Sequence, residues 1–263
     1  MAEIVDVTGD GREDAIADAA DALRAGALVV LPTDTVYGLA ADAFSVTGTA
    51  GIFTAKARPR TVPLPVLVRG PKQLVGITRQ VPAAAERLMA AYWPGELTIV
   101  IAAEPNLRWD LGSSEGTVAV RMPLDDVTLA VIRAVGPLAV TSANVSGRPA
   151  ATTVEEAREQ FGDAVRYYLD DGPRANALPS TVVDLTRSTP HVLRTGSLDD
   201  EEVLAVARGE VDPFATTEDQ DDGGDDGGDD GGDGDARGGD ARGGDDGGGD
   251  DGGGGPAEDG TPG

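Results

Sequence analysis

The sequence predicts an α/β fold in which helices flank a mixed, largely buried sheet. Three observations lead to this prediction. Segments with apolar residues at helical spacing alternate along the chain with short runs rich in valine, isoleucine and leucine. Those runs show little alternation with polar residues, as expected for strands covered on both faces. The chain before residue 214 has about 210 residues, which is enough to bury a substantial core.

Helices are expected where apolar residues recur every three or four positions. They are, in order, residues 11–27, a short stretch within 33–44, then 47–58, 81–92, 126–136, 154–162 and 199–207. The first is expected to close near Gly26, since glycine commonly follows the last turn of a helix. The helix at 47–58 is expected to begin at Thr47, whose hydroxyl can cap a free amide group of the first turn.

Strands are expected at short apolar runs bounded by turn-forming residues. They are, in order, residues 27–32, 65–69, 97–104, 117–123, 137–144, 165–172, 180–186 and 191–196. The first run, ALVVLP, is apolar throughout and ends at Pro32, which has no amide hydrogen for a ladder. The last run contains the single histidine, His191, which we expect at a strand edge rather than as a catalytic base.

The net charge of −25 divides unevenly along the 263 residues. Residues 214–263 contain 17 acidic residues, 2 arginines and 20 glycines and therefore carry −15, which leaves −10 on the rest. This tail has one large apolar residue and cannot bury enough surface to offset its ordering entropy. We expect one folded domain over residues 1–213 and a disordered, acidic Gly/Asp-rich tail over residues 214–263.

Composition excludes several classes of protein. The absence of cysteine excludes a disulfide framework, a thiol nucleophile and a cysteine-ligated metal, and a single histidine leaves no histidine-rich metal cluster, so no metal site is expected. No apolar run approaches the roughly 18 residues that span a bilayer, and no basic-then-apolar leader begins the chain. A cytoplasmic protein without a membrane partner is expected.

Lysine occurs only at Lys56 and Lys72, beside 19 arginines. Together with the acidic excess, this bias predicts adaptation to high salt, as in a halophilic archaeon; the codon usage of a GC-rich genome is the alternative. An acidic body repels nucleic acid on average, so a phosphate site must be a local basic pocket.

Polar segments beside predicted strands are candidate binding sites, because ligands of open α/β sheets bind at strand ends. PTDTVYGL, at 32–39, offers hydroxyl and carboxylate groups, with Gly38 allowing close backbone approach; a helix cap is the alternative. KARPR, at 56–60, could clamp phosphate oxygens if Lys56 and Arg58 point the same way along an extended chain. A solvated basic face is the alternative there.

Two further segments have the same character. In TVAVRMP, Thr117 and Arg121 lie on one face of the predicted strand, and an arginine ending so apolar a strand needs a ligand or a salt bridge. The segment 137–149, PLAVTSANVSGRP, opens from a strand into hydroxyl and amide side chains that suit phosphate or ribose; a solvated turn is the alternative. WPGELT, by contrast, is expected to be a structural turn.

In order and spacing, PTDTVYGL, KARP, WPGELT, VAVRMP, TSANVSG, PSTVVDL and VLRTG resemble the YrdC-type domain of the L-threonylcarbamoyladenylate synthases, over about residues 13–208. The resemblance implies a single domain whose twisted sheet lines a deep electropositive cavity. It also implies a reaction in which L-threonine, bicarbonate and ATP give L-threonylcarbamoyladenylate and pyrophosphate. A downstream threonylcarbamoyl transferase complex uses that product to make N6-threonylcarbamoyladenosine in tRNA.

Residue roles follow from the same resemblance. Substrate threonine is expected at Thr35, Arg121, Thr141 and Ser180. ATP is expected at Lys56, Arg58, Thr117, Ser142, Ala143, Asn144 and Arg194. Lys56 and Arg58 are the expected catalytic pair, with Mg²⁺ alongside, since the carbamate formed from threonine and bicarbonate itself attacks the α-phosphate and no side-chain nucleophile is needed.

The chain departs from the family at Val62 and Leu67, where asparagine and histidine are common, so backbone contacts or none are expected there. Longer members also have a second C-terminal domain, for which residues 214–263 are no substitute. Two alternatives stay open: an RNA-binding module using the same cavity, with weak tRNA contact, and a paralogue of the same fold with another activity. The chain has few aromatic residues for stacking on bases, at 4%.

Overall fold

The computed structural model describes residues 1–175, 178–212 and 214. Within these residues ten strands form one sheet in the order β1-β8-β2-β3-β7-β4-β6-β5-β9-β10. The strands are β1 Glu3–Asp6, β2 Val29–Leu31, β3 Gly38–Asp42, β4 Val66–Leu67, β5 Leu97–Ala102, β6 Thr117–Arg121, β7 Leu138–Ser142, β8 Tyr167–Asp170, β9 Thr181–Asp184 and β10 His191–Arg194. Four neighbouring pairs are parallel and five antiparallel, which confirms the predicted mixed sheet.

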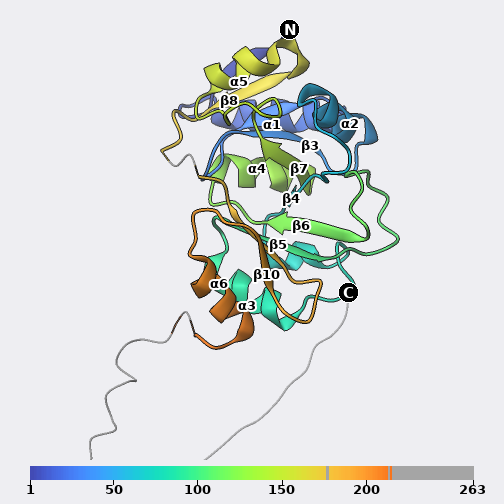
Figure 1. Cartoon of the computed structure of the whole chain (residues 1–263). Helices are drawn as coiled ribbons and strands as arrows, with labels where there is room; N and C mark the ends of the chain where they lie inside the picture. Colours follow the sequence, from blue (N-terminus) through green and yellow to red (C-terminus); the bar gives the residue numbers. More distant parts are fainter. Residues whose placement is uncertain (176–177, 213, 215–263) are drawn as a thin grey trace, which may run out of the picture. The chain divides into compact units, whose positions relative to one another are not determined.

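Helices flank this sheet along its length. In the described part of the chain they are α1 Arg12–Arg24, α2 Val46–Ala55, α3 Ala83–Tyr92, α4 Asp126–Val135, α5 Val154–Phe161 and α6 Asp200–Arg208, with short 3-10 turns at Pro71–Leu74 and Gly162–Ala164. Figure 1 shows α1 and α4 beside β3 and β7, and α3 and α6 near β10 at the other end of the sheet. No described helix is both long and apolar enough to cross a membrane.

The two faces of the sheet are covered unequally. Val30 of β2 packs into a core with α2, α3, α5 and α6, which also takes in apolar side chains of β5, β6 and β9. Its neighbours Val29 and Leu31 point to the opposite face and pack against α1 and α4. No described side chain of β5, β6, β9 or β10 joins that second core. The end of the sheet that α1 and α4 leave uncovered is where a cavity opens.

Three local expectations are wrong. Gly38–Asp42 is strand β3 and not a short helix, because it pairs antiparallel with both β2 and β7, and tertiary pairing overrides the helical preference of its alanines. Strand β1 was not expected, because a run of four residues with two acidic ends carries little strand signal. Helix α2 is capped by Ser45, which accepts from the Gly48 amide at 3.1 Å, and not by Thr47.

Other local expectations are confirmed. Helix α1 ends just before Gly26, which has a φ of +84°, a conformation that favours glycine. His191 is exposed on β10, an outer strand of the sheet. The acidic tail expected over residues 214–263 lies, apart from Phe214, outside the described residues.

Candidate active site

A cavity of about 630 Å³ lies on the α1/α4 face of the sheet, at the end that these helices leave uncovered, and is lined by side chains of β4, β5, β6, β7, β9 and β10 and by the loops at their ends. The structure brings eight of the predicted site residues to its wall: Thr35, Arg58, Arg121, Thr141, Ser142, Asn144, Ser180 and Arg194. These residues come from six separate segments of the sequence, so the sheet order is what assembles the site.

The charge of the cavity wall is one-sided. Arg58, Arg121, Arg148 and Arg194 line it, and the described lining contains no Asp or Glu. Burial lowers the pKa of Arg58, and the neighbouring charge of Arg194 lowers it further. Burial likewise lowers the pKa of Arg194, with Arg121 adding to the effect. Guanidinium groups that crowd and repel each other in this way are suited to bind a polyanion.

Arg121 is fixed from behind by three acceptors. Its Nε donates to the Gly95 carbonyl at 2.8 Å and its Nη1 to the Thr35 hydroxyl at 3.3 Å, while Nη2 pairs with the Asp34 carboxylate. The side chains of both ion-pair partners are about nine-tenths buried. Since a guanidinium has five N–H groups, two are left for a ligand. The salt bridge considered as an alternative is therefore present, in a residue that also lines the cavity.

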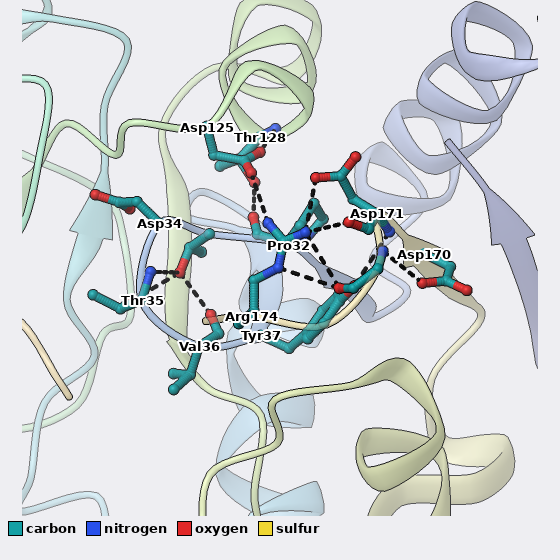
Figure 2. A network of polar contacts seen from close by, with 12 residues as sticks. Pro32, Asp34, Thr35, Val36, Tyr37, Asp125, Thr128, Asp170, Asp171 and Arg174 are labelled. Carbon is teal, nitrogen blue, oxygen red and sulfur yellow. Dashed lines mark hydrogen bonds and ion pairs between the residues drawn. The ribbon is translucent and has the colours of Figure 1, made fainter. Parts of the chain in front are cut away.

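The loop after β2, which carries Thr35, is braced at both ends (Figure 2). At its start, the Thr128 hydroxyl donates to the Pro32 carbonyl. At its end, the buried Tyr37 hydroxyl donates to the Gly172 carbonyl at 2.7 Å, and the Arg174 guanidinium lies 5.4 Å from the centre of the Tyr37 ring. Burial raises the pKa of Tyr37 to about 12, so the phenol stays a donor. Such bracing holds the loop in one position before a ligand arrives.

Asp125 connects this brace to α4. Its carboxylate caps the helix by accepting from the Thr128 amide at 2.8 Å, and it pairs with Arg174 at 3.4 Å. Burial raises the pKa of Asp125 to about 6; the Asp171 charge adds to the shift, and the Thr128 and Arg174 contacts oppose it.

Because the folded protein holds this proton more tightly than the unfolded chain, the contribution of Asp125 to stability falls as pH rises from about 4 to about 6. Asp125→Asn keeps a helix cap without titrating. We expect the thermal midpoint of the variant, measured relative to that of the wild type by circular dichroism, to rise between pH 4 and pH 7, because the wild type alone loses the contribution of Asp125 over this range. Asp126→Asn, at the exposed neighbouring position, is the matched control. An unchanged pH dependence in Asp125→Asn would contradict this assignment.

Lys56 does not line the cavity. It is 2% exposed, and its Nζ donates to the Ser142 carbonyl at 2.5 Å, the Asn144 carbonyl at 2.6 Å and the Asn144 Oδ1 at 3.2 Å. Burial, and then the charge of Arg58, lowers its pKa to about 8, although three oxygen acceptors favour the charged form. In the structure, Lys56 therefore anchors the turn after β7 from beneath.

The expected clamp of Lys56 and Arg58 does not form as predicted. Lys56 is the C-cap of α2 in helical conformation and Ala57 has a positive φ of 49°, so the chain is not extended, and the Lys56 ammonium is held by the Ser142–Asn144 turn. Arg58 alone lines the cavity, with Nε donating to the Val62 carbonyl at 2.9 Å and Nη2 to the Pro63 carbonyl at 3.0 Å. Val62 thus contributes through its backbone, as expected from its apolar side chain.

The turn at Ser142–Asn144 is ordered by its own side chains. The Ser142 hydroxyl donates to Asn144 Oδ1 at 2.6 Å, and Asn144 Nδ2 donates to the Arg148 carbonyl at 2.7 Å. Ala143 is buried behind the wall, and its amide donates to the Tyr37 carbonyl at 2.7 Å. A backbone hydrogen bond therefore links this turn directly to the loop after β2 that carries Thr35.

Ser180 and Arg194 contact each other in the wall. Arg194 donates through Nη2 to the Ser180 carbonyl at 2.8 Å and hydroxyl at 3.0 Å, and the Ser180 hydroxyl lies 2.8 Å from that of Thr98. Thr117 starts β6, four residues before Arg121, and donates to the Ser114 carbonyl at 2.7 Å. It is not among the residues of the cavity wall.

The predicted site residues did not include Thr98, Arg148, Val182 and Leu193 of the wall, nor Thr33, which the sequence offered only as one of the hydroxyl groups of PTDTVYGL. Of these residues, Arg148 could most easily have been predicted from the sequence, because it follows Gly147 within the polar segment at 137–149. Leu67, at one of the two positions that depart from the family, lines the cavity with an apolar side chain. Among the described residues, no cluster of three or more His, Cys, Asp or Glu could hold a metal ion.

Comparison with known proteins gives relatives over most of the folded region. The family model Sua5/YciO/YrdC, described as "Telomere recombination", matches residues 21–196. A Mycobacterium tuberculosis protein, provisionally designated a threonylcarbamoyl-AMP synthase, is 47% identical over 195 residues, which cover 74% of this chain and 90% of that protein. The Bacillus subtilis threonylcarbamoyl-AMP synthase is 37% identical over 206 residues, which cover 77% of this chain and 60% of that protein.

Solved structures of related proteins have the same fold as this chain. Pyrococcus abyssi Sua5 complexed with L-threonine matches with a TM-score of 0.72 at 35% identity, covering 78% of this chain and 60% of that one. Escherichia coli YciO, at 24% identity and a TM-score of 0.69, shares the fold and is covered completely. This chain thus spans about three fifths of the Pyrococcus and Bacillus proteins. The family predicted from the ordered motifs is confirmed, and the chain belongs to the Sua5/YciO/YrdC family.

Proposed function

We propose that this chain is a threonylcarbamoyl-AMP synthase, which joins L-threonine, bicarbonate and ATP into L-threonylcarbamoyladenylate and releases pyrophosphate. The observation that carries the proposal is the cavity itself. Four arginines and several hydroxyl groups line it without a carboxylate among the described lining residues, in a family whose Pyrococcus member has been solved with L-threonine. A wall of this kind suits a triphosphate and an amino-acid carboxylate together.

The reaction requires the protein to position the substrates and to stabilise the negative charge on the phosphates. The amine of threonine forms a C–N bond with bicarbonate and water is lost, which gives a carbamate. A carbamate oxygen then bonds to the α-phosphorus of ATP as the bond to the β-phosphate oxygen breaks, and pyrophosphate leaves. Arg58, Arg148 and Arg194 are placed to stabilise charge on the phosphates, so no side chain has to act as nucleophile.

The two substrates contact different parts of the cavity wall. Arg121 offers its two remaining N–H groups to the threonine carboxylate, with Thr35, Thr141 and Ser180 around it. The turn anchored by Lys56 faces the nucleotide through Ser142 and Asn144, while Lys56 and Ala143 shape that turn from behind. In this proposal, Thr117 has no contact with either substrate.

Mg²⁺ is expected to enter with ATP. The cavity wall of arginines and hydroxyls does not fit a protein-held divalent cation, whereas Mg²⁺ commonly binds through substrate phosphates. We further propose that the enzyme acts in the cytoplasm and passes its product to a threonylcarbamoyl transferase complex, with at most weak direct contact to tRNA.

Pyrophosphate release from ATP tests this function. We expect release to require both L-threonine and bicarbonate, in purified full-length protein at high salt. Turnover that is identical without threonine would contradict the proposal and favour a paralogue with another activity. Tight, salt-sensitive binding of tRNA without any ATP dependence would instead favour an RNA-binding module.

The acidic tail is expected to have no catalytic part. Deleting residues 214–263 should leave kcat and both KM values within about twofold of the wild type, because the predicted substrate contacts all lie earlier in the chain. Solubility in salt should fall, since the deletion removes −15 of net charge. Steady-state kinetics and a salt-dependent solubility assay measure the two effects. A clear loss of kcat would contradict a purely solubilising role.

A further inference from the structure

On the basis of the function proposed above, we propose that Thr33 is a positioning residue that fixes the direction of the Thr35 hydroxyl, so that Thr35 meets the substrate only as a hydrogen-bond acceptor. Both side chains are buried, at 5% and 3% exposure, and both line the cavity. Their oxygens lie 3.0 Å apart, a distance at which one hydroxyl donates to the other.

The contacts of Thr33 decide which of the two donates. The Thr33 hydroxyl lies 2.6 Å from the Val36 carbonyl, which can only accept, and its oxygen accepts from the Thr35 amide at 3.2 Å. A hydroxyl has one hydrogen to donate. Because that hydrogen of Thr33 is committed to the Val36 carbonyl, the Thr35 hydroxyl must donate to Thr33.

The contact with Arg121 limits Thr35 further. Arg121 Nη1 donates to the Thr35 oxygen at 3.3 Å, and a guanidinium cannot accept. The Thr35 oxygen therefore has its hydrogen and one lone pair engaged, and one lone pair free. The chain of donation runs from Arg121 through Thr35 and Thr33 to the Val36 carbonyl. Figure 2 shows Thr35 and Val36 on the braced loop.

A single free lone pair selects the chemistry of the ligand beside it. It accepts from an amine or a hydroxyl and is repelled by a carboxylate, which only accepts. Arg121, at the next position on the wall, has the opposite preference and takes the carboxylate. The pair thus distinguishes the two ends of an amino acid: the carboxylate is directed to Arg121, and an N–H or O–H of threonine to Thr35. Without Thr33, the Thr35 hydroxyl could rotate and offer its hydrogen instead.

The test compares Thr33→Val, which removes the acceptor, with Thr33→Ser, which restores it. Thr33→Val is expected to raise the KM for L-threonine about tenfold, the size of one hydrogen bond, and to leave the KM for ATP within about twofold. Thr33→Ser should return to within about threefold of the wild type. Thr49→Val, at a fully buried threonine of α2 outside the cavity wall, controls for the loss of a buried hydroxyl.

Binding of L-2-aminobutyrate, which lacks the threonine hydroxyl, identifies the donor by calorimetry. An equal loss of affinity for both ligands in Thr33→Val assigns the amine to Thr35, and a loss for threonine alone assigns the hydroxyl; both support the inference. An unchanged threonine affinity in Thr33→Val, or a serine variant that does not recover, overturns it. If the wild type binds threonine but releases no threonine-dependent pyrophosphate, the proposed reaction fails while the calorimetric comparison still decides this inference.

Discussion

Replacing Arg121 by alanine is expected to raise the KM for L-threonine by about a hundredfold, with a smaller effect on the KM for ATP. The lost contact is a charge-assisted one inside a buried site, and truncating such a pair commonly costs 2–5 kcal/mol, which corresponds to at least about thirtyfold in affinity. Arg121→Lys should recover little, because an ammonium cannot donate to Gly95, Thr35 and Asp34 and still present a planar pair of N–H groups.

Arg121→Ala also leaves Asp34 buried without its cation. Only one of the carboxylate oxygens of Asp34 is paired, since Oδ2 is buried without a hydrogen-bond partner. We therefore expect the variant to lose on the order of 3 kcal/mol of unfolding free energy. Adding Asp34→Asn should restore much of the stability and none of the threonine affinity. A double variant with wild-type KM for threonine would sink the carboxylate assignment.

Lys56→Met is expected to lower kcat by about a hundredfold and to destabilise the protein by a few kcal/mol. The substitution removes the donor that three oxygens of the Ser142–Asn144 turn share. The Ser142 carbonyl keeps the Asn144 amide at 2.9 Å and the Asn144 Oδ1 keeps the Ser142 hydroxyl at 2.6 Å. The Asn144 carbonyl is left without a donor, and an unpaired buried acceptor costs about 1–3 kcal/mol. The turn lines the cavity, so its displacement removes contacts to the nucleotide. Lys56→Arg should not recover activity, since a larger planar group cannot occupy a site built around one nitrogen.

The other lysine provides the control for this prediction. Lys72→Met removes an exposed charge from the 3-10 turn at Pro71–Leu74 and should leave kcat and the thermal midpoint unchanged. Pyrophosphate release at saturating substrate concentrations measures kcat, and thermal denaturation measures the change in stability. If Lys56→Met keeps full stability and raises only the KM for ATP, Lys56 contacts the nucleotide directly and does not act through the turn.

The pattern of apolar residues along the sequence predicted most of the helices and strands, because the signal for each element lies within a short segment of the chain. The apolar runs within Val29–Leu31 and Thr117–Arg121 both become strands of the sheet. Strand β1 carried too little signal to be expected. Gly38–Asp42 is the other exception, because its alanines favour a helix and become a strand only through partners on both sides. The order of ten strands is likewise a property of pairing between distant segments, and no local pattern encodes it.

The candidate site was predictable in its residue types and less so in its contacts. Eight of the residues predicted from the ordered motifs line the same cavity. The partner of Arg121 is 87 positions away at Asp34, and the oxygens that hold Lys56 lie more than 80 positions away, so neither contact could be read from spacing. The difference between Lys56, buried beneath the wall, and Arg58, on it, depends on the positive φ of Ala57, for which alanine gives no signal.

The most direct test of the account is the fate of isotope-labelled bicarbonate supplied with L-threonine and ATP. Mass spectrometry of the nucleotide products should show a threonylcarbamoyl adenylate that carries the label in the wild type. The Arg121→Ala, Asp34→Asn double variant should form it only at greatly raised threonine concentration. Labelled product at undiminished threonine affinity in that variant, or a wild type that yields only unlabelled adenine nucleotides, would contradict the assignment of this cavity to threonylcarbamoyl-AMP synthesis.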